Sequence, residues 1–233
     1  MFGRCVEGIR RKMWMLRLPG VYRPQADTAL LTEALRQATV PRGARVLDLC
    51  TGTGAVAVAA ARETAGAVVA VDLSVRAVLA TRVNARLRGA RVRVHRGDLL
   101  TPVAGELFDV ILANPPYVPS GRFPPPRHGR SRCWDAGPDG RALLDRICDQ
   151  APRHLAPGGT LLVAQSSVCG VDDTLRALRA AGLKTSVAAR RREPFGPVMR
   201  SRTADLLARG AIRPGQDDEE LVVIRADHTR PRG

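Results

Sequence analysis

The sequence predicts a doubly wound α/β fold, in which a mostly parallel sheet of seven strands is covered by helices on both faces. Short apolar segments alternate with helical segments through the middle of the chain, and this alternation is typical of βαβ units. The strand segments are apolar at most positions, as strands buried on both faces are. The chain has 233 residues, of which 45% are hydrophobic and 25% charged. These values suit one domain with a full hydrophobic core.

The first half of the chain contains three predicted strands and three predicted helices. Each strand is a short apolar run, and the second helix is rich in alanine. Ser74 can cap the third helix, because a serine hydroxyl accepts a bond from a free backbone N–H. In chain order, these elements are a helix within residues 22–39 that packs at the sheet edge, a strand at 45–49, a helix at 55–64, a strand at 67–72, a helix at 75–87 and a strand at 92–96.

The second half continues the pattern with four more strands. In chain order, it has a strand at 108–113, a loop at 121–140, a helix at 141–154, a turn at 156–159, a strand at 160–165, a helix at 171–181, a strand at 184–189, an insertion at 195–216 with a helix near 201–209, a strand at 220–225 and a polar tail at 226–233. We find no linker. The prediction is therefore a basic N-terminal extension at residues 1–20, followed by a single domain at residues 21–233.

The net charge and the cysteine pattern indicate which partners and which cellular compartment to expect. The net charge is +15, from 37 Lys and Arg against 22 Asp and Glu. This excess fits either the codon usage of a GC-rich genome or attraction to RNA, the ribosome or an acidic partner. The five cysteines are dispersed without a C-x-x-C motif, which favours reduced thiols over disulfides or a metal site. No apolar run suggests a membrane span or a signal peptide, so we expect a cytoplasmic protein.

A Gly-rich turn and three acidic residues indicate a nucleoside site. Asp48 precedes the turn Cys50-Thr-Gly-Thr-Gly54, where glycines let the backbone approach a ligand closely. Asp72 ends the next strand, and its two oxygens suit the paired hydroxyls of a ribose. Asp98, after the third strand, can accept a bond from the exocyclic amine of adenine. Taken alone, these features also fit a nicotinamide dehydrogenase or ordinary turns.

The motif Asn114-Pro-Pro-Tyr117 follows the fourth strand and gives the strongest chemical signal. Two consecutive prolines fix φ and remove two backbone donors, so this corner offers acceptors: the Asn114 side-chain oxygen and the Pro115 carbonyl. Two acceptors aimed at one point suit a planar NH2 group. Holding both N–H bonds orients the nitrogen lone pair toward an electrophilic methyl group. Tyr117 can pack against the flat substrate.

With these motifs, residues 46–117 resemble a class I S-adenosylmethionine-dependent methyltransferase of the amino-methylating N-P-P-Y type. Within that group the chain resembles the HemK family, which methylates the glutamine side-chain amide of peptide-chain release factors. Val21-Tyr-Arg-Pro-Gln-Ala-Asp-Thr-Ala-Leu-Leu31 is similar to V-Y-x-P-x-E-D-T/S-x-L-L of the short archaeal and eukaryotic branch. Cys133-Trp-Asp-Ala-Gly-Pro-Asp-Gly-Arg141 is similar to the W-x-G-G-x-x-G-R loop of that branch. The resemblance covers residues 18–187 and resumes at 220–225.

The resemblance implies a Rossmann-like fold, S-adenosyl-L-methionine as cofactor and a glutamine of the Gly-Gly-Gln loop of a release factor as methyl acceptor. It implies no metal, no membrane and a small activating partner. The implied cofactor-binding residues are Thr28, Asp48, Cys50, Gly52, Gly54, Asp72, Asp98 and Leu99. The implied catalytic residues are Asn114, Pro115 and Tyr117, and the implied acceptor-binding residues are these three with Pro116 and Trp134.

Three residues depart from the family pattern, and three different functions remain open. Ala26, Cys50 and Ala136 stand where the family has Glu, Gly and Gly. The N-P-P-Y corner would serve an adenine-N6 methyltransferase acting on DNA or RNA equally well, and the basic charge favours that function slightly. No base-reading domain is visible, which counts against it. The motifs would also fit a small-molecule N-methyltransferase or a non-catalytic cofactor-binding subunit.

Overall fold

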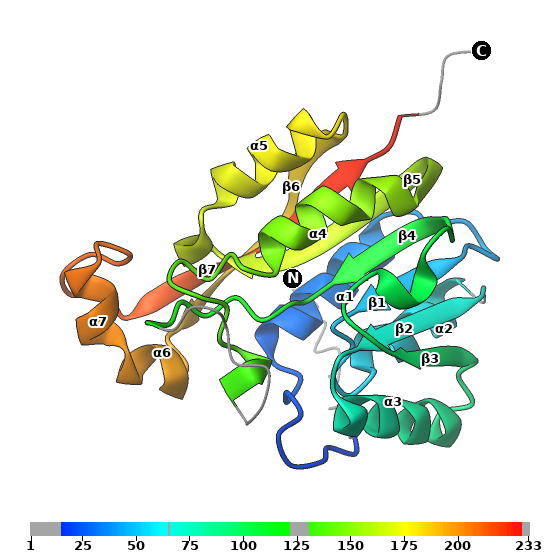
Figure 1. The fold of residues 1–233 in the computed structure, drawn as a ribbon, viewed down its shortest axis with the longest axis horizontal. Coiled ribbons are helices and arrows are strands. Elements are labelled where there is room, and N and C mark those ends of the chain that lie inside the picture. Colours follow the sequence, from blue (N-terminus) through cyan, green and yellow to red (C-terminus); the bar gives the residue numbers. More distant parts are fainter. Residues whose placement is uncertain (1–14, 65, 122–130, 230–233) are drawn as a thin grey trace, which may run out of the picture.

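The structure is a computed structural model that describes residues 15–64, 66–121 and 131–229. Its seven strands form one sheet in the order β3-β2-β1-β4-β5-β7-β6 (Figure 1). The strands are β1 (Val46–Leu49), β2 (Val68–Asp72), β3 (Val92–Arg96), β4 (Phe108–Ala113), β5 (Leu155–Ser166), β6 (Lys184–Pro194) and β7 (Asp218–Asp227). Strands β1 to β5 pair in parallel, and β7 lies antiparallel to both β5 and β6. The predicted doubly wound, mostly parallel sheet is confirmed.

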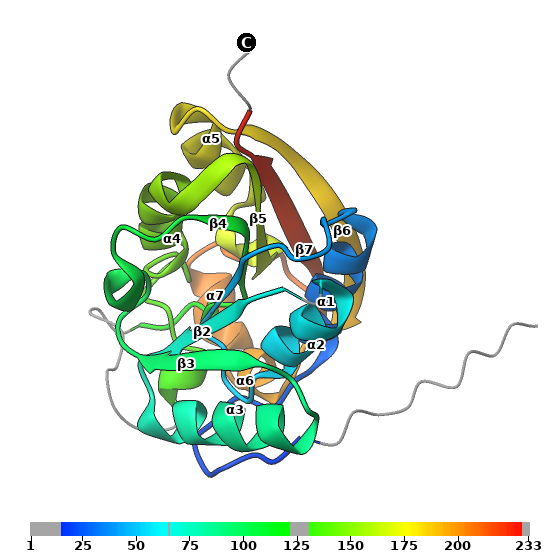
Figure 2. The ribbon, with the colours of Figure 1, turned by 90° about the vertical axis from the view of Figure 1, so that its right-hand side faces the viewer.

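Helices cover both faces of the sheet (Figure 2). One face carries α1 (Ala26–Gln37), α2 (Ala55–Thr64) and α3 (Val75–Leu87), and the other carries α4 (Leu144–Gln150) and α5 (Val171–Ala180). Successive strand residues point to opposite faces, so Val46 packs with the first group and Leu47 with the second. Because both faces are covered, a ligand site is confined to the ends of the strands.

Short helices complete the fold. Four 3-10 turns occur in the described part of the chain, at Thr101–Val103, Ser131–Cys133, Ala151–His154 and Ser167–Cys169. Residues 122–130, which are nine of the twenty residues of the predicted loop at 121–140, lie outside the described residues, as do residues 1–14 and 230–233 of the two predicted ends. No helix in the described part combines the length and the apolar character that a membrane crossing requires.

Two helix predictions need correction. The helix α1 packs on the face of the sheet, against residues of β5 and β7 such as Leu162 and Val223, and not along its edge. The helix predicted at 141–154 begins at Leu144, and its last four residues form a 3-10 turn. Pro152 lies at the start of that turn; it has no N–H with which to continue an α-helical ladder.

The last three strands are longer than predicted because pairing extends them into polar sequence. The predicted turn at 156–159 is part of β5, which shifts register there against β4. The residue after β7 satisfies the backbone at this point. Gly158 donates to the His228 carbonyl over 2.9 Å, and His228 donates to the Gly159 carbonyl over 2.8 Å. In β6, charged residues as far as Pro194 pair with β7, down to Asp218. Cross-strand hydrogen bonds, and not apolar character, set these ends.

The segment 195–216 connects β6 to β7 and contains two short helices where one was predicted. They are α6 (Pro197–Ser201) and α7 (Thr203–Ala208), separated at Arg202. Their apolar side chains form a small separate cluster of Phe195, Met199, Leu206 and Ile212. In Figure 1 these orange helices lie beside the green loop that follows β4. The segment therefore borders the end of the sheet where the predicted motifs lie.

Candidate active site

A cavity of about 920 Å³ opens at the carboxyl ends of the central parallel strands. This volume is at the upper end of the roughly 300–1,000 Å³ range of small-molecule sites. Twelve of the sequence-predicted site residues line it: Thr28, Asp48, Cys50, Gly52, Asp72, Asp98, Leu99, Asn114, Pro115, Pro116, Tyr117 and Trp134. Its wall also includes residues 20–28, before and at the start of α1, and the beginnings of α6 and β7.

Asp48 organises the turn after β1 from inside the protein. Its Oδ2 accepts bonds from the Thr51 hydroxyl over 2.6 Å and from the Ala57 backbone over 3.0 Å, which ties the turn to α2. Burial raises the pKa of the Asp48 carboxyl to about 7, although these two bonds oppose the shift. Cys50 has φ +57°, a left-handed conformation that favours glycine. Burial and the nearby carboxylates raise the pKa of its thiol, which stays neutral.

Asp72 joins the Gly-rich turn to the next helix. Its Oδ2 accepts a bond from the Gly52 backbone over 3.0 Å, and its Oδ1 accepts one from the Ser74 backbone over 2.8 Å. The Ser74 hydroxyl in turn caps α3 by accepting from Ala77, as the sequence predicted. The carboxylate is thereby fixed in the cavity wall at the end of β2, where a ribose would meet it.

Gly54 is the one predicted site residue of the described chain that does not line the cavity. It has φ +81°, and a Cβ built there would lie 2.7 Å from Thr81 Cγ2 and 3.1 Å from Thr81 Cα. Because Gly54 has no side chain, the turn can approach α3 closely. The sequence pattern alone could not separate this packing role from ligand contact.

Asp98 lies in the cavity wall and makes an ion pair of 3.0 Å with Arg146 of α4. Both side chains are about half exposed, so the pair adds little stability. Leu99, with φ +47°, is buried beside Asp98. Arg146 also lines the cavity, and nothing in the sequence pattern had pointed to it.

Asn114 presents a buried acceptor without a protein partner. Its Nδ2 donates over 3.4 Å to the Thr28 hydroxyl, and its Oδ1 has no hydrogen-bond partner in the described chain. The Thr28 hydroxyl donates to Asp27 Oδ1 over 3.2 Å, so its lone pairs face the Asn114 amide. Thr28 therefore orients Asn114, a contact that the sequence did not predict.

Asp27 accepts the hydrogen bonds that hold this corner together. Neither Asp27 nor Tyr22 was predicted from the sequence as a site residue. Asp27 Oδ2 accepts from the Tyr22 hydroxyl over 2.8 Å and from the Tyr117 hydroxyl over 3.1 Å. Its Oδ1 accepts from the Thr28 backbone over 2.6 Å. Burial and the Asp27 charge raise the pKa of both phenols, which remain donors. The signal was present in the segment Val21–Leu31, where Tyr22 and Asp27 match the family pattern.

The loop that carries Trp134 is held from both sides. Val118 donates to the Trp134 carbonyl over 2.7 Å, and Ala136 donates to the Val118 carbonyl over 3.1 Å. At the end of this loop, the buried Arg141 guanidinium donates to the carbonyls of Cys169 and Gly170 over 2.6 and 2.8 Å. The backbone that positions Trp134 is therefore anchored to the segment after β4 and to the turn before α5.

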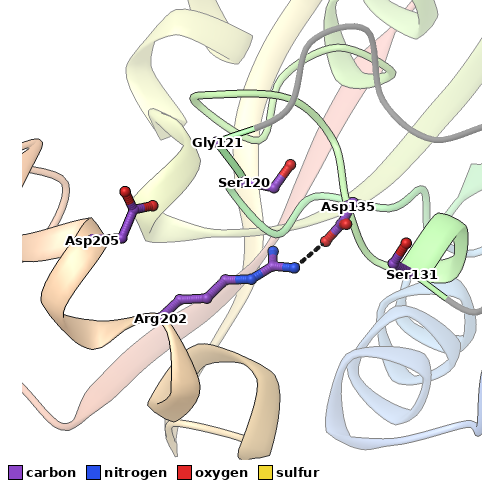
Figure 3. Close-up of a pocket in the computed structure, with 6 residues that line it drawn as sticks. All are labelled: Ser120, Gly121, Ser131, Asp135, Arg202 and Asp205. Carbon is purple, nitrogen blue, oxygen red and sulfur yellow. Dashed lines mark hydrogen bonds and ion pairs between the residues drawn. The ribbon is translucent and has the colours of Figure 1, made fainter.

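A smaller hollow of about 480 Å³ lies between this loop and the helices α6 and α7 (Figure 3). It is lined by Ser120, Gly121, Ser131, Asp135, Arg202 and Asp205. Arg202 points across it to Asp135, with Nη2 2.5 Å from Oδ1, and also donates to the Pro119 carbonyl over 2.9 Å. Asp135 is buried. One ion pair thus connects the segment 195–216 to the loop beside Trp134.

The chain is similar in sequence to several known proteins. A family model described as the methyltransferase small domain matches residues 12–123. A protein of Methanocaldococcus jannaschii, named provisionally as a protein N5-glutamine methyltransferase, is 34% identical over 83% of this chain and 94% of its own length. The release factor glutamine methyltransferase of Geobacter sulfurreducens is 40% identical over 62% of this chain, which spans only 53% of that longer protein.

A solved structure extends the likeness to three dimensions. The structure of the E. cuniculi Mtq2-Trm112 complex, described as responsible for methylation of the eRF1 translation termination factor, has a chain that superimposes with a TM-score of 0.63. The two chains are 25% identical, and the match covers 90% of this chain and 99% of that one.

Proposed function

Because the chain belongs to the methyltransferase small-domain family, in its HemK-like glutamine methyltransferase group, we propose that it methylates the side-chain amide of a glutamine in a protein. It is a class I S-adenosyl-L-methionine-dependent methyltransferase. The methyl acceptor, the residues that hold it and the partners of the enzyme are what we propose beyond this.

The observation that carries the proposal is the unpartnered Oδ1 of Asn114. A buried acceptor without a donor costs roughly 1–3 kcal/mol, so it suits a ligand that supplies an N–H. The two prolines that follow have no N–H of their own, which leaves the Pro115 carbonyl as a second acceptor nearby. A primary amide supplies two N–H donors in one plane. Such an acceptor pair fixes the direction of the nitrogen lone pair.

The other end of the cavity fits the cofactor. S-adenosylmethionine supplies an electrophilic methyl group on a positively charged sulfur. Asp72 would hold the ribose hydroxyls, and Asp98 and Leu99 would flank the adenine, with Asp98 held in place by Arg146. The backbone of Gly52, fixed by Asp72, would border the methionine part. The acidic side chains around Cys50 also suit a cationic ligand.

Within this corner, each residue has a separate task. Asn114 and Pro115 would accept the two N–H bonds of the substrate amide and align its nitrogen with the methyl group. Thr28 would keep the Asn114 oxygen turned toward the amide. Tyr117, fixed by Asp27, would form a flat wall beside the amide, and Trp134 would contact the polypeptide around it.

We further propose that the substrate is the Gly-Gly-Gln loop of a peptide-chain release factor. The support is the likeness to release factor glutamine methyltransferases over more than half of the chain. An exposed loop can enter a cavity of about 920 Å³ that must also hold the cofactor. The cytoplasm is then the site of action, because translation termination occurs there.

A small activating partner is also part of the proposal. The outer face of α3 exposes Val75, Leu79, Val83 and Leu87 at four-residue spacing, and these side chains form one stripe beside the edge strand β3. Such a stripe is typical of a docking surface. We expect a double variant, Leu79→Ser with Val83→Ser, to keep its basal activity but to lose any activation by a partner from host extract. Equal activation of both forms would contradict this assignment.

The decisive experiment incubates the enzyme with labelled S-adenosylmethionine, a release factor and host extract, and maps the label by mass spectrometry. We expect one methyl group on the glutamine of the Gly-Gly-Gln motif. In Asn114→Ala, turnover should fall by roughly 10²–10³, the size expected when one pre-organised polar contact is lost, while cofactor affinity measured by calorimetry stays the same. Label on nucleic acid or on a small molecule, with none on glutamine, would refute the proposal.

A further inference from the structure

The wall of the main cavity contains a second buried acceptor besides Asn114. In the described part of the chain, six buried side-chain atoms lack a hydrogen-bond partner, and two of them belong to residues that line this cavity: Asn114 Oδ1 and Glu219 Oε2. Buried polar atoms of native proteins are almost always paired. Two unpaired acceptors in one cavity therefore suit a ligand that brings a hydrogen-bond donor to each of them.

Glu219 lies near the start of β7, at the point where the chain returns from the segment 195–216. It is only 9% exposed. Ser166, at the end of β5, hydrogen bonds to its side chain, but this leaves Oε2 without a partner. Burial, together with the charges of Asp27 and Glu193, raises the pKa of its carboxyl. The group is thus desolvated and surrounded by negative charge, which makes an external donor favourable.

The surroundings of Glu219 belong to the acceptor end of the cavity. Its charge acts on the phenols of Tyr117 and Tyr22, and Asp27 acts on it. The carboxylate of Asp27 is already occupied by the two phenols and by Thr28. Of these two carboxylates, Glu219 is the one with a buried oxygen that has no hydrogen-bond partner in the described chain.

We propose that Glu219 is an acceptor-binding residue, whose carboxylate receives a hydrogen bond from a backbone N–H of the substrate polypeptide beside the methylated amide. The inference rests on the proposed function and adds to it a hydrogen bond from the backbone of the substrate polypeptide. A backbone N–H is the donor that any polypeptide presents next to the methylated side chain, whatever its sequence. Glycines next to the glutamine leave their N–H groups uncovered.

The test measures methylation of a Gly-Gly-Gln peptide by the wild-type enzyme and by Glu219→Gln, which keeps the shape of the side chain and removes its charge. The Gln oxygen still accepts a hydrogen bond, so the variant loses the charge of the acceptor, which corresponds to about 10-fold in affinity. We expect KM for the peptide to rise by that factor, while kcat stays within about 3-fold and S-adenosylhomocysteine binds as before. Glu220→Gln is the matched control, because Glu220 is the next residue of the strand, pairs with Arg190 at the surface and does not line the cavity.

A second peptide distinguishes a direct hydrogen bond to Glu219 from a general disturbance of the site by the substitution. It carries an ester in place of the amide N–H next to the glutamine. If Glu219 receives that N–H, the ester raises KM of the wild type by about 10- to 100-fold but KM of Glu219→Gln by only about 3-fold, because a bond to a neutral acceptor is weaker than a bond to a charged one. An unchanged KM in Glu219→Gln, or an ester effect equal in both enzymes, overturns the inference and leaves the proposed function intact. If the wild-type enzyme methylates neither the release factor nor the peptide at glutamine, the proposed function and this inference both fall.

Discussion

Replacing Arg202 with methionine tests whether the Arg202–Asp135 ion pair holds the segment 195–216 to the loop that carries Trp134. The variant removes the 2.5 Å contact to Asp135 and the bond to the Pro119 carbonyl. Asp135 is only 3% exposed, while the side chain of Arg202 is 22% exposed. Breaking a fully buried pair costs about 3–5 kcal/mol, and the partial exposure of Arg202 puts the expected loss at the lower end, about 3 kcal/mol.

The measurement is urea unfolding followed by circular dichroism, with thermal unfolding as a second readout. For a chain of this size, a loss of about 3 kcal/mol lowers Tm by roughly 6–12 °C. The double variant Arg202→Met with Asp135→Asn should regain about 2 kcal/mol, because no uncompensated buried charge is left. Arg209→Met is the control: its pair with Asp205 is exposed and contributes about 0.5 kcal/mol or less. A loss below about 1 kcal/mol in Arg202→Met, or strictly additive effects in the double variant, would refute the reasoning.

Three further predictions concern the turn and the cofactor end of the cavity. The native pKa of Asp48, about 7, lies above its usual value of about 3.9, so between these pH values the native state holds a proton that the unfolded chain has released. The free energy of unfolding of the wild type, relative to Asp48→Asn, should therefore fall by about 4 kcal/mol as the pH rises from 4 to 8; parallel stability curves would contradict this. Gly54→Ala should lose about 2–4 kcal/mol in urea unfolding, from its positive φ and the contact with Thr81. Thr81→Ala in the same chain should restore part of that loss, since it removes the nearest atom, and no recovery would mean that the contact is unimportant. Asp72→Asn should weaken S-adenosylhomocysteine binding by about 10- to 100-fold in calorimetry and leave kcat at saturating cofactor within a few-fold; a large fall in kcat with normal binding would reverse the role given to this carboxylate.

The order of elements, the cap of α3 and one corner of the site could be predicted because their causes are local. Apolar runs in β1, β2 and β4 are long enough to define buried strands without knowledge of their neighbours. Ser74 caps α3 through a contact three residues away. The prolines of Asn114-Pro-Pro-Tyr117 constrain the backbone by their own covalent structure, so an acceptor-rich corner was visible in the residue types alone.

The ends of the strands and the role of Gly54 could not be predicted from local sequence patterns. The charged end of β6 is a strand because it pairs with β7, which lies more than twenty residues further along the chain. Pairing partners at that separation leave no periodic signal in either segment. Gly54 matched the ligand-binding pattern of the turn, but its missing side chain makes room for Thr81 on another helix.

The sequence by itself determined that this protein has a doubly wound sheet. It also predicted a nucleoside site from Asp48, Asp72 and Asp98 and an amide-binding corner at Asn114, because each of these signals is a short local motif at the end of an apolar strand. Only the tertiary structure decided which groups complete that corner. Thr28 orients Asn114 across 86 positions, Asp27 reaches Tyr117 across 90, and Glu219 arrives from the last strand. Hydrogen bonds between such distant residues form only when packing brings their strands and helices together, and the same packing decides which buried polar atoms are left without a partner.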